Sequence, residues 1–147
     1  MILISHRGNV AGSRPERENH PDYIFDACIA GYNVEIDVWF IDNQWFLGHD
    51  GPQYRIDEEF LLNPKFWCHA KNIEALQAMR NIGAHCFWHQ NDDVVLTSKG
   101  FLWTFPGKKL YNLSICVLPE AANYTLEELS VGGGICSDFI DRYKKNE

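Results

Sequence analysis

Two histidines, an arginine and a pair of carboxylates stand within the first third of the chain. His6 and Arg7 follow a short apolar run, Glu35 and Asp37 are separated by one residue, and His49 comes after them. A histidine can donate or accept a proton near neutral pH, and an arginine offers planar donors to phosphate oxygens. Carboxylates at positions i and i+2 of a strand point to one face, where both can hold a hard cation. These residue types predict cleavage of a phosphodiester beside a bound divalent metal.

The elements that position these residues follow from apolar periodicity and from turn residues. Residues 1–5 form an apolar run typical of a buried strand, and a helix is expected from Pro21 to about Gly31. Residues 34–40 alternate, so the two carboxylates share one face and the apolar residues share the other. A tight turn then predicts that residues 44–47 return as the second strand of a hairpin.

The middle of the chain continues the alternation of strands and helices. Residues 66–71 predict a strand, and residues 85–89 predict another. Between them, Asn72 is suited to cap a helix whose apolar residues recur at helical spacing until Gly83. A strand–helix–strand rhythm is typical of a parallel α/β sheet.

The second half of the chain departs from this rhythm. Residues 94–97 and 101–105 predict a β-hairpin, because no crossover helix fits between them. Three further elements are expected: a strand over residues 113–118, a short helix that begins with a capping box at Thr125, and a strand over residues 135–139.

The order and spacing of the polar motifs resemble the glycerophosphodiester phosphodiesterase family. In that family a first strand ends in His-Arg-Gly, a Pro-Glu-Asn segment opens the first helix, the second strand carries Glu-x-Asp, and a short hairpin delivers His-Asp. The corresponding segments here are His6-Arg7-Gly8, Glu18-Asn19, Glu35-Ile36-Asp37 and His49-Asp50. The match is dense over residues 1–50 and thinner after them.

The resemblance implies a metal-dependent hydrolase of glycerophosphodiester-like or other small phosphodiesters. The implied roles are metal ligation by Glu35 and Asp37, acid–base catalysis by His6 and His49, and phosphate binding by Arg7 and Lys71. Which histidine is the acid and which is the base stays open. The implied cofactor is a divalent ion, with magnesium, calcium, manganese and zinc as the alternatives.

His69 is the residue at which the chain departs from the family. The family has a glutamate ligand two residues before its lysine, whereas His69 stands two residues before Lys71 here. Either the imidazole replaces that carboxylate, which would favour manganese or zinc over magnesium or calcium, or the site has drifted. We include His69 among the metal ligands. Drift would instead favour a catalytically silent or repurposed member that binds a phosphorylated small molecule or a sugar-phosphate polymer.

Chain length restricts the fold. The 147 residues suit a single domain, residues 1–147, with one core. A complete eightfold barrel needs about 200 residues or more. We therefore expect an α/β fold of the reduced or incomplete TIM type, with some helices missing and the β-hairpin in its second half. Apolar surface left uncovered around residues 101–105 predicts a homodimer.

Charge and composition restrict the partners. The net charge of −7 argues against a nucleic-acid partner and against an anionic membrane surface. A small phosphodiester is the expected partner, without membrane insertion, because no apolar run approaches the length of a membrane helix. The N-terminal residues have no basic leader, which predicts a cytoplasmic protein. Five cysteines without Cys-x-x-Cys spacing predict small buried hydrophobes rather than a disulfide framework or a zinc cluster.

Overall fold

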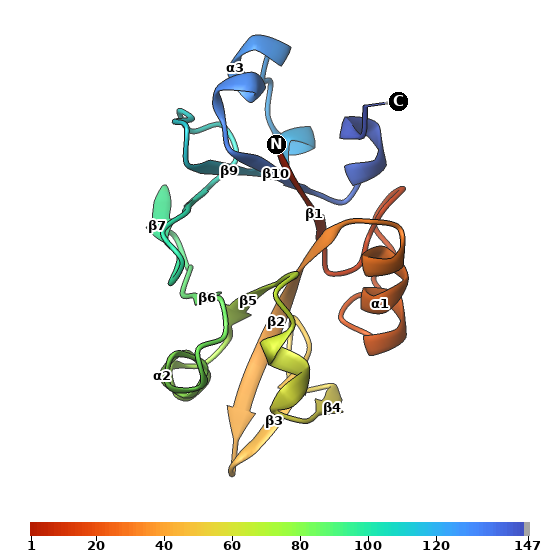
Figure 1. Ribbon diagram of the computed structural model, residues 1–147, viewed down its shortest axis with the longest axis vertical. Helices are drawn as coiled ribbons and strands as arrows, with labels where there is room; N and C mark the ends of the chain where they lie inside the picture. Colours follow the sequence, from red (N-terminus) through yellow and green to blue (C-terminus); the bar gives the residue numbers. More distant parts are fainter. Residues whose placement is uncertain (146–147) are drawn as a thin grey trace.

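The computed structural model describes residues 1–145 and shows a mixed α/β fold whose single sheet curls into a partial barrel (Figure 1). The α/β class expected from the sequence is confirmed. The strands that lie parallel are, in spatial order, β6 (Cys86–Phe87), β5 (Phe66–Ala70), β2 (Asn33–Ile41), β1 (Ile2–His6), β10 (Gly134–Ser137), β9 (Ser114–Val117) and β8 (Leu102–Thr104).

A β-hairpin stands at the far end of this curled sheet, as the sequence predicts. β7 (Val94–Leu96) lies antiparallel to β8, with Val95 opposite Trp103. Within residues 1–145, β7 and β6 share no strand ladder. They are tied instead by a backbone hydrogen bond of 2.9 Å from Ser98 to Cys86 and by a bond of 2.8 Å between His85 Nε2 and Thr97 Oγ1. The sheet is therefore a partial barrel with a weakly joined seam.

A second hairpin extends from β2. β3 (Gln44–Leu47) returns antiparallel along it after a turn at Asp42 and Asn43, whose φ angles of +50° and +59° suit a tight hairpin turn. β4 (Tyr54–Ile56) adds to β3. The sequence did not predict β4, because three residues are too few to establish an alternating pattern.

Three helices cover the outside of the sheet, and three 3₁₀ turns connect elements. The helices are α1 (Pro21–Ile29), α2 (Ile73–Ile82) and α3 (Leu126–Val131), and the 3₁₀ turns are η1 (Glu59–Leu62), η2 (Pro119–Ala121) and η3 (Ile140–Tyr143). Asn72 caps α2 by accepting a hydrogen bond from Ala75, and Gly83 ends that helix at φ +79°. Thr125 opens α3 with a capping box. The caps expected from the sequence are confirmed.

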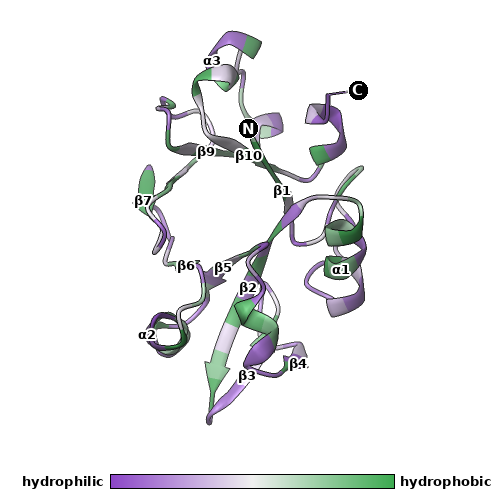
Figure 2. Ribbon diagram, viewed as in Figure 1, coloured by the Kyte–Doolittle hydropathy of each residue, from purple (hydrophilic) through white to green (hydrophobic). Residues whose placement is uncertain are grey.

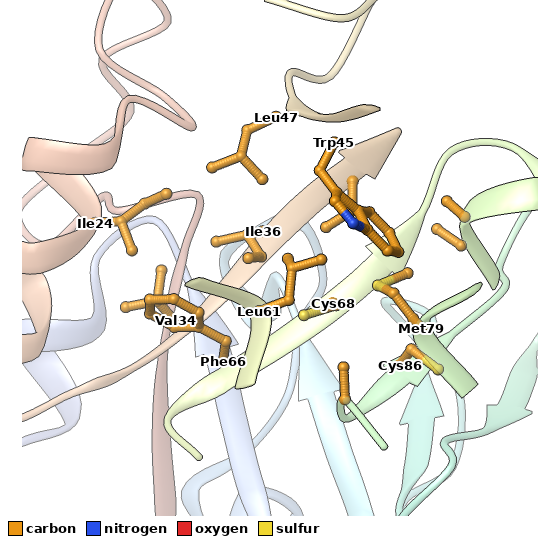
Figure 3. Close-up of a cluster of buried hydrophobic side chains, with 14 of the residues drawn as sticks. Ile24, Val34, Ile36, Trp45, Leu47, Leu61, Phe66, Cys68, Met79 and Cys86 are labelled. Carbon is orange, nitrogen blue, oxygen red and sulfur yellow. The ribbon is translucent and has the colours of Figure 1, made fainter. Parts of the chain in front are cut away.

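Alternation along the strands divides the apolar residues into an inner and an outer layer. Val34, Ile36 and Val38 face outward and pack with α1 and α2, in the cluster that Figure 3 shows. The residues that fill the inside of the curled sheet are Ile4, Trp67, Phe87, Trp103, Ile115 and Cys136. A further outer cluster, centred on Ile135 and Ile140, packs under α3 and η3. Large aromatic rings therefore occupy the interior of this short barrel.

Exposed apolar surface was expected over residues 101–105. This expectation is wrong for Trp103, which is buried, and is confirmed for Phe105, which is exposed. Trp103 is 4% exposed because it points inward against Phe87, at a ring distance of 4.5 Å. Phe105 and Leu96 are exposed, and β7 forms a hydrophobic segment at the periphery in Figure 2. A homodimer that covers this surface stays a prediction.

The cysteines and the helices agree with two further expectations. All five cysteines are free thiols, and four of them are buried. Among residues 1–145, no helix combines the length and apolarity needed to cross a bilayer.

The hydrogen bond between His85 and Thr97 at the seam of β6 and β7 should contribute to the stability of the fold. Burial and the nearby charge of Lys99 lower the pKa of His85 to about 4, so the ring is neutral where it meets Thr97. Thr97→Val leaves the buried Nε2 of His85 without a partner and should lower the free energy of unfolding by about 1–3 kcal/mol.

Urea denaturation at pH 7.5 measures this loss. Thr97→Ser keeps the hydroxyl and is the matched control; equal losses in both variants would exclude the hydrogen bond as the cause.

The same histidine predicts a pH dependence. Its pKa in the folded protein lies below the ordinary value of 6.5. The stability contributed by neutral His85 is therefore complete above about pH 6.5 and is lost as the pH falls towards 4. In His85→Gln this part of the acid destabilisation should be absent. The free energy of unfolding should be measured between pH 7 and pH 4. An equal loss over this range in wild type and in His85→Gln would contradict the prediction.

Candidate active site

The site lies where the parallel strands end on the inside of the sheet. Because side chains alternate along a strand, His6 follows Ile4 on the inner face of β1, and His69 follows Trp67 on that of β5. Glu35 and Asp37 occupy the corresponding face of β2, directly between these two strands. The period of two therefore places a layer of polar side chains next to the inner aromatic core.

Glu35, Asp37 and His69 form a compact group of three potential metal ligands. One ligand atom from each lies within 4.8 Å of the other two. His69 Nδ1 is 3.2 Å from Asp37 Oδ1 and 3.8 Å from Glu35 Oε1. Two carboxylate oxygens and one imidazole nitrogen suit manganese or zinc, and also accept magnesium. The structure thus brings together the three residues expected to hold a metal.

Two oxygens of this group have no hydrogen-bond partner in the described part of the chain. They are Glu35 Oε2 and Asp37 Oδ1, on residues that are 2% and 0% exposed. Burying an unpaired carboxylate oxygen is costly, and two carboxylates side by side also repel each other. A divalent cation would satisfy both oxygens and offset the repulsion. The residues present therefore fit a metal ion.

The hydrogen bonding of His69 selects one tautomer of its ring. Nε2 lies 3.0 Å from the carbonyl oxygen of His89, and only a protonated nitrogen can donate to a carbonyl. With a metal bound, a proton on Nε2 would leave the lone pair of Nδ1 free for the ion; without one, a proton on Nδ1 would face Asp37 Oδ1 at 3.2 Å. The ring also stacks on Phe87, at 5.2 Å and an interplanar angle of 7°. A carbonyl that fixes the tautomer in this way is typical of metal-binding histidines.

Asp37 is held so that one of its oxygens remains free. Oδ2 accepts a hydrogen bond of 2.9 Å from Asn19 Nδ2 and lies 3.0 Å from Arg7 Nε. Asn19 also accepts a bond of 2.9 Å from the backbone N–H of Asp37. Oδ1 alone is left for a ligand. From the sequence alone, Asn19 could equally belong to a helix start or to the site. In the structure its side chain is hydrogen-bonded to Asp37.

The two carboxylates respond differently to the same burial. Burial raises the pKa of Glu35, and the adjacent charge of Asp37 raises it further. Burial alone would also raise the pKa of Asp37, but contacts with His69 and Arg7 outweigh it, so its pKa falls well below the usual range. Without a metal, Asp37 is therefore the carboxylate that the fold holds as an anion.

His6 is oriented by an aspartate from the other end of the chain. Its Nδ1 is hydrogen-bonded to Asp138 Oδ1 at 2.7 Å, and its Nε2 lies 3.7 Å from Glu35 Oε2. Burial alone would lower the pKa of His6, but the bond to Asp138 and the charge of Glu35 raise it. From the sequence, a structural role for Asp138 is at least as well supported as a functional one. Asp138 stands two residues after the inward-facing Cys136, so strand alternation predicts that its side chain faces the site.

His49 reaches the same region from the loop after β3. Trp39 Nε1 donates a hydrogen bond of 2.7 Å to the carbonyl of Gly48, which anchors the start of this loop. Gly48 has φ +152°, and a Cβ there would lie 2.0 Å from the backbone oxygen of Gly51. His49 is half-exposed and lies 2.8 Å from Asp50 Oδ1. The tight loop therefore presents this histidine to solvent.

One cleft of about 780 Å³ is lined by three of the seven expected site residues, His6, Arg7 and His49, whereas the buried Glu35 and Asp37 and the partly buried His69 are not part of its lining. It is lined by His6, Arg7, Ser13, Pro15, Glu18, Asn19, His49, Asp50, Gly51, Pro52, Gln53, Leu118 and Asp138. Lys71 is not among these residues. It follows β5, where its backbone N–H donates to Val38, and its ammonium group has no ion pair within residues 1–145. The expected phosphate-binding role of Lys71 stays a prediction.

Comparisons with protein-family models, with curated proteins and with solved structures gave no match. They identify no family for this chain.

The pKa of Glu35 is raised and that of Asp37 is lowered, so neutral substitutions at the two positions should have opposite effects on the stability of the metal-free protein. The raised pKa of Glu35 means that its ionisation destabilises the fold as the pH rises above about 4.5. Glu35→Gln should therefore raise the melting temperature at pH 7 in the presence of a chelator, and this gain should vanish near pH 4. Glu16→Gln removes an exposed carboxylate and is the control. A fall in melting temperature at pH 7 for Glu35→Gln would contradict the prediction.

Asp37→Asn should instead lower the stability of the metal-free protein at pH 7. Its depressed pKa means that the ionised form stabilises the fold above about pH 4, and this contribution is lost as the pH falls below that value. Added manganese should raise the melting temperature of the wild-type protein and of neither variant. Equal manganese stabilisation in all three proteins would exclude the metal centre.

Proposed function

We propose that the protein is a metal-dependent phosphodiesterase that cleaves a small phosphodiester by acid–base catalysis with two histidines. One observation carries the proposal: a buried group with two unsatisfied carboxylate oxygens adjoins a cleft that two histidines line, each beside an aspartate. Metal ligands and paired acid–base groups at one cleft are what phosphodiester cleavage requires.

Each group in the cleft has a chemical role in this proposal. A divalent ion held by Glu35, Asp37 and His69 would supply positive charge for the phosphate. His6 is held by Asp138 at 2.7 Å and exchanges a proton on one side of the phosphate. His49, on the loop that forms another part of the cleft wall, exchanges the second proton. The two histidines lie on different elements, as an acid and a base on opposite sides of a phosphate require.

Arg7 is suited to hold the phosphate. Among the described residues that line the cleft, it is the only lysine or arginine. Its Nη1 lies 3.2 Å from Glu18 and its Nε lies 3.0 Å from Asp37, so the guanidinium is held at the edge of the ligand group. The protein carries a net charge of −7 and therefore repels anions at long range. An anionic substrate needs the local positive charge of Arg7.

The lining of the cleft favours a small polar substrate. Besides the charged groups, it offers Ser13, Asn19 and Gln53, and its apolar residues Pro15, Pro52 and Leu118 are too few to enclose an acyl chain. A glycerophosphodiester-like compound with a small alcohol head group matches this lining. The partial barrel is, in this proposal, a reduced TIM-type barrel, similar to the glycerophosphodiester phosphodiesterase family.

The alternative is a catalytically silent member that binds a phosphorylated small molecule or a sugar-phosphate polymer. The position of Lys71 outside the cleft favours it, because one expected source of phosphate affinity is missing. The two histidine–aspartate pairs favour catalysis, since binding alone does not require them.

Turnover tests the proposal directly. His6→Ala and His49→Ala should each lower the rate of cleavage of glycerophosphodiesters by about 100-fold or more, as expected when acid–base catalysis is lost. The measurement is release of the alcohol from a panel of glycerophosphodiesters with manganese present. His20→Asn is the matched control, because His20 caps α1 outside the cleft and asparagine can also cap. Near-full turnover in either alanine variant would contradict that histidine's role.

A further inference from the structure

Asn9 is fully buried beside the cleft, and its side-chain amide makes four hydrogen bonds. Nδ2 donates to Glu18 Oε1 at 2.9 Å and to Asp138 Oδ1 at 2.8 Å. Oδ1 accepts from the backbone N–H of Arg14 and from the hydroxyl of Tyr23, both at 3.1 Å. The exposed fraction of Asn9 is 0%. Every donor and lone pair of the amide is therefore used, which fixes its orientation.

The two acceptors of Asn9 are themselves partners of the residues that face the cleft. Glu18 lies 3.2 Å from Arg7 Nη1, and Asp138 holds His6 at 2.7 Å. Asn9 thus stands at the centre of a chain that runs from Arg7 through two carboxylates to His6. No other side chain in the described part of the chain bonds to both carboxylates.

Charge explains why an amide is needed at this place. Burial would raise the pKa of both Glu18 and Asp138, but hydrogen bonds, including those from Asn9, lower both below their usual values. Each of the two anions accepts one N–H of the same amide, and hydrogen bonds to an ionised carboxylate are stronger than those between neutral groups. Aspartate has no donors to offer, and alanine would leave both carboxylates facing a void.

The backbone brings Asn9 to this place. Arg7 and Gly8 have φ angles of +56° and +94°, which turn the chain sharply after β1. The N–H of Asn9 then donates to the carbonyl of His6 at 2.9 Å. A Cβ on residue 8 would lie 2.6 Å from the ring of Tyr23, so glycine permits the turn.

We propose that Asn9 is a positioning residue that couples the orientation of His6 to that of Arg7 by bridging Asp138 and Glu18. The role assigned to these two residues rests on the proposed phosphodiesterase function, whereas the coupling itself is a property of the structure. Asn9 touches neither the metal ligands nor the substrate. Its loss should therefore affect the rate of the reaction more than it affects metal binding.

The experiment is Asn9→Ala, measured in two independent ways. In the metal-free protein, the ring N–H resonance of His6, assigned by its absence in His6→Ala, should shift and exchange faster with water. With manganese present, kcat should fall by about tenfold or more, because small displacements of catalytic groups are costly. The affinity for manganese should change by less than about threefold, because Asn9 is hydrogen-bonded to none of the three expected metal ligands. An unchanged His6 resonance in a folded Asn9→Ala protein would overturn the proposal.

Two further variants keep the test decisive. Tyr23→Phe removes a bond to the amide oxygen but keeps both N–H bridges, so it should leave the His6 resonance in place. If Asn9→Ala does not fold, Glu18→Ala takes its place: loss of the Arg7 side of the chain should still shift the His6 resonance through Asn9. Asp50→Asn, which removes a cleft carboxylate that does not contact Asn9, controls for charge alone. No shift in Glu18→Ala, or an equal shift in Asp50→Asn, would overturn the coupling.

The two measurements separate this proposal from the proposed function. The resonance requires no substrate, so a shift in Asn9→Ala supports the coupling even if the wild-type protein cleaves no diester. Full kcat in a variant whose His6 resonance has shifted would show that the bridge does not serve catalysis, and would overturn the positioning role.

Discussion

Two carboxylates buried side by side on β2 are the constraint on which the rest of the site depends. Glu35 and Asp37 are almost inaccessible to water, so their charges must be offset by neighbours. Arg7, Asn19 and His69 approach them from three different segments, and none is adjacent to β2 in sequence. Two oxygens still lack a partner among residues 1–145. A cation would complete this arrangement, and without one the group is a local cost to stability that a functional site can retain.

Aromatic packing and hairpins support this arrangement in a short chain. Trp67, Phe87 and Trp103 fill the inside of the curled sheet, where rings from three strands contact one another. β7 and β8 are joined as a hairpin without a helix between them, and the seam beside this hairpin is joined by few hydrogen bonds. The three expected metal ligands lie on β2 and β5, which pair with each other over five residues.

The sequence predicted the features that depend on local pattern. The alternation of β2 placed Glu35 and Asp37 on one face, and Asn72 and Thr125 marked helix starts that the structure confirms. Features that depend on contacts between distant segments were not predictable. Asp138 meets His6 across nearly the whole chain, and strand alternation indicates its face of the sheet but not the residue that it contacts. The seam and the burial of Asn9 likewise depend on how the sheet curls. Lys71 matched a motif, yet it is not among the residues that line the cleft, and motif spacing alone does not show which residues a cleft exposes.

We propose that the buried group on β2 and β5 binds a divalent metal. Anomalous scattering from a crystal soaked in manganese, recorded on both sides of the manganese absorption edge, tests this binding. We expect one strong peak in contact with Glu35, Asp37 and His69. A map with no peak there, in crystals that show manganese bound elsewhere on the protein, would contradict it.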